Sequence, residues 1–248
     1  MKKNILGIII LSFLISYSVV ASHPDESHSH GNKHENAPSP AIITNDNEYL
    51  TNLNLMKGHL WVGIELYKTS SIDNAKMHMK HPKSELYGDM VPTFKARGAP
   101  GFATELENLS SSVQSEESIK IVNDRYSNLF VAISKNEEFI TQGNDSIDKK
   151  IKLVISLLEI AAKEYAIGIV NGKVENVYEY QDALGFTTMA KNNLLDINTK
   201  NINNKLRISK IIDILNFLLP LWPELVPNSN IDGDARTIID AIEKIKKI

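Results

Sequence analysis

The 248-residue sequence contains no cysteine. This absence excludes disulfide bonds, thiolate zinc sites, covalently attached haem and cysteine nucleophiles, so stability must come from an ordinary hydrophobic core. Strong positive charge is also absent, because the formal net charge is −3 at pH 7 and no stretch of the chain resembles a basic stripe. A nucleic-acid partner is therefore not expected.

The chain also lacks the short motifs of common enzyme chemistries. It has no nucleophile elbow, phosphate-binding loop, dinucleotide fingerprint or H-E-x-x-H zinc-protease signature. Only three histidines lie beyond residue 45, which leaves little material for a hydrolase triad. The sequence gives an enzyme no positive support, and a non-catalytic role is the preferred prediction.

Residues 1–21 have the parts of a secretory signal peptide. Two lysines open the segment, residues 5–20 are almost continuously apolar, and small side chains lead up to Ala21. The apolar run is shorter than the roughly 20 residues that span a bilayer. We expect cleavage after Ala21 or Ser22 and a mature protein that is periplasmic or secreted. The alternative is a retained N-terminal anchor.

Residues 22–45 hold four of the seven histidines, three prolines and hardly an apolar residue. Such a segment buries too little surface to offset its ordering entropy, so a disordered tail is predicted. Imidazole is a good ligand for zinc, copper and iron, and flexible spacing lets several rings converge on one ion. The tail histidines are therefore predicted to capture metal, with a plain polar linker as the alternative; they are His23, His28, His30 and His34.

Beyond residue 46 the apolar residues follow the i, i+3, i+4, i+7 spacing of helices almost throughout. The predicted helices cover about 48–72, 82–95, 102–113, 115–138, 151–170, 174–196, 208–219 and 235–248. Asn171-Gly172 would suit a hairpin, but both flanks have helical spacing, so a corner between two helices is predicted. The expected fold class is all-α: an antiparallel helical bundle over 46–248, with two packed bundles as the alternative.

The folded part contains two histidine motifs. His78 and His81 are i, i+3 neighbours, so their rings can share one metal on a helix, and Glu85 can join if the helix continues. The alternative for this pair is a solvated helix end. His59 lies on an apolar stripe with Gly63, which permits close approach of another helix. A hydrogen-bonded core histidine is the alternative there.

Carboxylates gather on one predicted helix. Glu175, Glu179 and Asp182 are spaced i, i+4, i+7, which places them on one face. Like charges at this spacing repel unless something positive lies between them. A metal ion, or positive charge from His59 and Arg97, would relieve the repulsion. A solvated acidic face is the alternative.

The segments GHLWVGIELY, HPKSELYGDMVPTFKARGAPGF and EYQDALGF are typical of exported bacterial helical-bundle proteins. Across residues 50–196 the chain resembles, in style, the imelysin and EfeO group of periplasmic metal-uptake proteins. This resemblance implies an all-helical bundle with inward-facing histidines and acids. The H-x-x-E motif of imelysins is absent, so the resemblance assigns no ligand residue.

We therefore predict a periplasmic protein that binds zinc, iron or copper in a metal uptake or homeostasis system, with a membrane transporter or envelope protein as partner. The alternative is a binding or scaffold module of the cell envelope that holds no metal. The predicted ligands are the nitrogens of His59, His78 and His81, with oxygen from Glu85, Glu105, Glu179 or Asp182.

Overall fold

The computed structural model describes residues 40–141, 146–227 and 230–248. The predicted signal peptide and the four tail histidines lie outside these residues. The first helix of the described residues is α1, Pro40–Thr44, which lies inside the segment 22–45 that the sequence assigned to the tail. No helix in the described ranges is both long enough and apolar enough to cross a membrane.

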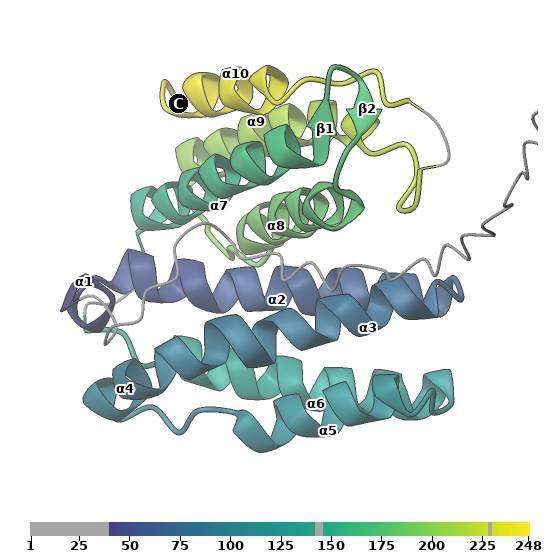
Figure 1. Cartoon of the computed structure of the whole chain (residues 1–248). Coiled ribbons are helices and arrows are strands. Elements are labelled where there is room, and N and C mark those ends of the chain that lie inside the picture. Colours follow the sequence, from purple (N-terminus) through teal and green to yellow (C-terminus); the bar gives the residue numbers. More distant parts are fainter. Residues whose placement is uncertain (1–39, 142–145, 228–229) are drawn as a thin grey trace, which may run out of the picture. The chain divides into compact units, whose positions relative to one another are not determined.

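The first half of the described chain folds into one helical bundle (Figure 1). Its elements are α2 (Asp46–Lys68), α3 (Ile72–His81), the π-helical turn η1 (Pro82–Tyr87), α4 (Gly88–Arg97), α5 (Ala103–Gln114) and α6 (Ile119–Glu137). Helix α2 packs on α3 and α6, and α5 also packs on α3 and α6. These contacts close a ring of four helices around an apolar interior.

The second half forms another ring of four helices. Its elements are α7 (Ile147–Gly168), β1 (Ile169–Val170), β2 (Lys173–Val174), α8 (Val177–Leu195), α9 (Ile202–Leu218), the 3₁₀ turn η2 (Leu219–Leu221) and α10 (Arg236–Ile245). Helix α7 packs on α8 and α10, and α9 packs on both of those. The all-α prediction is confirmed. The helices form two packed bundles, which is the alternative that the sequence left open. Helix α2 joins the bundles by packing on α7 and α8.

The structure differs from the sequence prediction at Pro82. This residue does not open a separate helix, because α3 continues through η1 into α4. A proline inside a helix removes one backbone donor and crowds the carbonyl four residues earlier. The π-helical turn that begins at Pro82 changes the hydrogen-bond pattern there, and the helix continues.

The predicted helical corner at Asn171-Gly172 was wrong. Both residues have positive φ, 52° and 75°, as in a type I′ turn, and the flanking pairs form the antiparallel strands β1 and β2. Helical geometry ends at Gly168, and Ile169 is already extended. The local turn preference of Asn-Gly therefore prevailed over the helical spacing of its flanks.

Helices α2 and α8 cross where Gly58 meets Gly185. A Cβ atom on Gly185 would lie 2.7 Å from the carbonyl oxygen of Gly58, closer than real Cβ contacts come. A Cβ on Gly63 would lie 2.5 Å from the Cε of Met79, so α3 also approaches α2 closely. The glycines therefore bring α3 and α8 against the same part of α2, and His59 lies there.

Candidate metal centre

Two imidazoles and one carboxylate meet in the interior between α2, α3 and α8. The Oδ1 atom of Asp182 lies 2.6 Å from the Nδ1 of His59 and 3.1 Å from the Nδ1 of His78. All three side chains are at most 1% exposed. The sequence separates these residues widely, so only the packing of α2, α3 and α8 creates the cluster.

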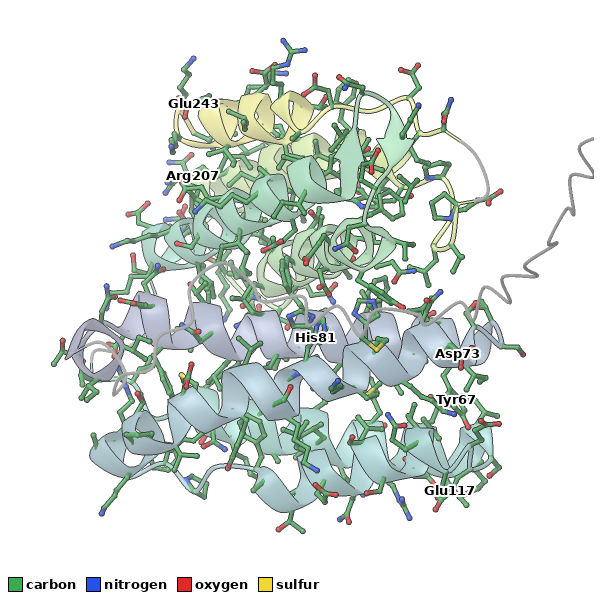
Figure 2. The ribbon with its side chains drawn as sticks, viewed as in Figure 1. Tyr67, Asp73, His81, Glu117, Arg207 and Glu243 are labelled. Atoms are coloured by element: carbon green, nitrogen blue, oxygen red, sulfur yellow. The ribbon has the colours of Figure 1, made fainter. Side chains whose placement is uncertain are left out.

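His81, which is labelled in Figure 2, has its ring near those of His59 and His78. Its ring centroid is 5.8 Å from that of His59 and 6.4 Å from that of His78, and the residue is buried. Its nitrogens do not belong to the close group of ligand atoms that the described residues form. His81 would therefore have to turn its side chain in order to join a metal held by the other residues.

The charge of Asp182 follows from its neighbours. Burial raises the pKa of its carboxyl group, but the charges and hydrogen bonds of His59 and His78 outweigh burial and hold this pKa well below its usual range. Asp182 is therefore an ionised carboxylate in the protein interior at neutral pH. A buried anion needs a balancing cation, which protonated imidazole or a metal ion can supply.

The geometry fits a transition metal. One ligand atom from each of His59, His78 and Asp182 lies within 4.8 Å of the others. Ligands about 2.1 Å from one ion lie about 3.0–3.4 Å apart, so shifts of about 1 Å or less would bring these atoms to coordination distance. Imidazole nitrogen with carboxylate oxygen suits zinc, iron(II) or copper(II). No thiolate is available in this cysteine-free chain.

The other predicted oxygen donors are placed differently. Glu179 is buried on α8, one turn before Asp182, but it is outside the close group of ligand atoms. Glu105 lines a surface groove between α5 and α6 together with Arg125 and Lys135, so it does not join the histidines. The side chain of Glu85 lies outside the described part of the chain. Of the predicted oxygen donors whose side chains the structure describes, Asp182 is the one that meets the histidines.

Charge relief by Arg97, which the sequence allowed, is not observed. Arg97 pairs with Asp46 at 2.8 Å, and its guanidinium lies over the ring of Tyr49. His59, the other partner that the sequence offered, contacts Asp182 instead. Glu175 is exposed just before α8 begins, so the three carboxylates do not form one buried face.

Sequence reasoning gave no role at the site to the residues that surround the imidazoles. Gln181 contacts His78, Phe186 packs edge-on against His59 at 5.1 Å, and Tyr178 packs against His78 at 6.0 Å. All three belong to α8. Tyr178 and Phe186 lie four residues before and after Asp182, so their place on its helix face was visible, whereas Gln181 is its chain neighbour. An uncharged amide or ring carries no signal of a ligand partner in a single sequence.

Residues 141–248 match a family model described as an iron permease-associated 4-helix bundle domain. The second bundle of the chain is similar to this domain. The matched range contains α7, α8, α9 and α10, the four helices that close the second ring. No curated protein and no solved structure matches the chain.

The family match supports a helical-bundle family connected with metal uptake. It gives no specific support to the imelysin and EfeO group. The matched range contributes Asp182 through α8, whereas His59 and His78 come from the unmatched first bundle. The candidate centre is therefore built from both bundles.

Proposed function

We propose that this chain is the metal-binding component of an iron-uptake system, exported to the periplasm or secreted. The observation that carries the proposal is the buried contact of His59 and His78 with ionised Asp182. The similarity of residues 141–248 to an iron permease-associated domain supports the same role.

Iron is the favoured ion because of the family match. Two imidazoles and a carboxylate suit iron(II) as well as zinc and copper(II), so the donor set alone does not choose among them. The description of the matching family names iron, and this favours iron over zinc and copper(II). The histidine-rich tail would collect ions outside the cytoplasm, and the buried centre would hold one ion.

The proposed partner is a membrane permease for the ion. The second bundle is the region similar to a permease-associated domain, so its surface is the proposed contact. An ion bound by His59, His78 and Asp182 would join the first bundle to the second. Metal binding would then stabilise their packing, because a ligand that binds the native state alone stabilises that state.

The test is a metal titration of the mature chain with its four tail histidines replaced by glutamine. Iron(II) under anaerobic conditions, zinc and copper(II) are each expected to bind at one tight site per chain. At a free concentration 100 times the Kd, the ion should stabilise the protein by about 2.7 kcal/mol and raise its Tm. Asp182→Ala should abolish both effects.

Glu105→Gln is the matched control. It removes a carboxylate that the sequence nominated but the structure places in the α5–α6 groove, so tight binding should persist. If no ion raises the Tm, or if Asp182→Ala binds metal as well as the wild type does, the proposal is wrong. If no metal changes the Tm, the result would favour the alternative, a binding or scaffold module of the cell envelope that holds no metal.

A further inference from the structure

Gln181 connects the candidate centre to a distant loop. Its side-chain Oε1 lies 2.8 Å from the Nε2 of His78, and its Nε2 donates to the backbone carbonyl of Leu225 at 2.9 Å. Gln181 and His78 are both fully buried. One amide group therefore bridges α3 and the segment that follows η2.

The orientation of this amide follows from Leu225. A backbone carbonyl can only accept a hydrogen bond, so the atom of Gln181 that faces it must be the NH₂ group. The atom that faces His78 must then be the carbonyl oxygen. The assignment rests on the hydrogen-bond partners, as amide assignments must.

The bond from Gln181 also fixes the hydrogen on His78. Because the carbonyl oxygen of Gln181 only accepts, the Nε2 of His78 must carry a proton and donate it. In neutral imidazole the other nitrogen, Nδ1, then presents its lone pair. That nitrogen lies 3.1 Å from the Oδ1 of Asp182. Either a proton on Nδ1 or a metal ion must therefore lie between this nitrogen and the carboxylate, and a bound ion would take the place of the proton.

We propose that Gln181 is a positioning residue that makes His78 bind the ion through Nδ1. This inference rests on the proposed metal-binding function and adds the binding atom and its support. A metal-bound histidine almost always donates its second ring N–H to an outer partner, which sets the tautomer and orients the ring. Gln181 is that partner for His78, and Leu225 holds Gln181 in turn.

The direct test is nitrogen NMR of the mature chain with ¹⁵N-labelled histidine and zinc as the diamagnetic probe. His78, assigned by comparison with His78→Asn, should show a proton on Nε2 and zinc on Nδ1. Zinc on the Nε2 of His78 would overturn this inference but leave the metal site standing. If zinc binds no histidine of the folded part, the proposed function fails, and the inference fails with it.

A second measurement repeats this NMR on zinc-bound Gln181→Met. Methionine has a similar length but no acceptor for the Nε2–H of His78, so zinc bound to Nε2 should appear beside zinc bound to Nδ1. If Gln181→Met shows zinc on Nδ1 alone, as in the wild type, Gln181 does not select the binding atom.

Zinc affinity separates this role from simple loop packing. Gln181→Met should weaken zinc binding about 10–100-fold, the usual effect of losing an outer partner of a ligand. The matched control is Tyr180→Phe, which removes a 2.8 Å bond from Tyr180 to the carbonyl of Glu224 in the same loop but touches no histidine. Zinc affinity should be unchanged in that variant.

Gln181→Glu keeps an acceptor for the Nε2–H of His78 but loses the N–H that donates to the carbonyl of Leu225. It should therefore bind zinc more tightly than Gln181→Met does. Equal losses in Gln181→Met and Tyr180→Phe, or a zinc affinity of Gln181→Glu no higher than that of Gln181→Met, would show that Gln181 acts only through the loop.

Discussion

The contact between Gly58 and Gly185 predicts that Gly185→Ala will destabilise the protein and weaken metal binding. A Cβ at position 185 would lie 2.7 Å from the carbonyl oxygen of Gly58 and 2.9 Å from the Cγ2 of Val62. The valine methyl can move, but the carbonyl belongs to the backbone of α2. Helix α2 must therefore shift away from α8.

The size of the effect follows from two opposing contributions. Alanine in a helix interior is more favourable than glycine by about 0.5–1 kcal/mol. Overpacking a tight contact costs about 1–3 kcal/mol, and the upper end applies here because the obstacle is backbone. We expect the free energy of unfolding to fall by about 2 kcal/mol. Restoring ordinary contact needs a shift of about 0.7 Å, which would also lengthen the 2.6 Å contact between His59 and Asp182.

Gly88→Ala is the matched control. Gly88 begins α4 with an ordinary helical φ of −55°, and a Cβ there would meet nothing within 4 Å. This variant should gain about 0.5–1 kcal/mol from helix preference alone. Urea unfolding of the metal-free proteins, followed by circular dichroism, measures both changes as shifts of midpoint at constant m-value.

The free energy of unfolding should fall in Gly185→Ala and rise in Gly88→Ala, and zinc affinity should fall only in Gly185→Ala. If Gly185→Ala is as stable as the wild type and binds zinc equally well, the close crossing of α2 and α8 is wrong. The account of how His59 reaches Asp182 would then be refuted as well.

Two further predictions concern charge and backbone conformation. Asp182→Asn should lower the free energy of unfolding by about 3–5 kcal/mol at neutral pH, because it leaves the buried imidazoles without their anion. The histidines lower the folded-state pKa of Asp182, so its stabilisation is present above the unfolded-state value of about 4 and is lost as the pH falls below that value. Urea midpoints of wild type and variant should therefore converge in acid, and a constant gap would contradict this reasoning. Gly172→Ala should destabilise by about 1–2 kcal/mol, because φ at Gly172 is 75°, and calorimetry that finds no loss would contradict the type I′ turn.

The sequence alone determined the fold class and most helices. Apolar residues at helical spacing recur along one face, and this pattern is a local property that needs no knowledge of neighbours. Some segments therefore emerged with nearly correct boundaries, as for α5, predicted at 102–113 and found at Ala103–Gln114. Others did not, because the helix predicted at 208–219 is α9, Ile202–Leu218, and α3 was not predicted as a helix. The pattern did not predict the hairpin at Asn171-Gly172, whose two strands together contain only four residues.

The histidines of the centre were also visible in the sequence, because imidazole is rare and chemically specific. Their oxygen partner was not determined by sequence, since Glu105 and Asp182 have the same chemistry and each lies on a predicted helix. Only the crossing of α2 with α8, held close by Gly58 and Gly185, brings Asp182 to His59.

The role of Gln181 was even less visible in the sequence than that of Asp182. An amide has no charge that would mark it in a sequence, and His78 is 103 residues away along the chain. Its role arises from two contacts made at once, one to an imidazole and one to a loop carbonyl. Sequence spacing determines which residues share a helix face, whereas tertiary packing decides which faces meet and therefore which atoms form the centre.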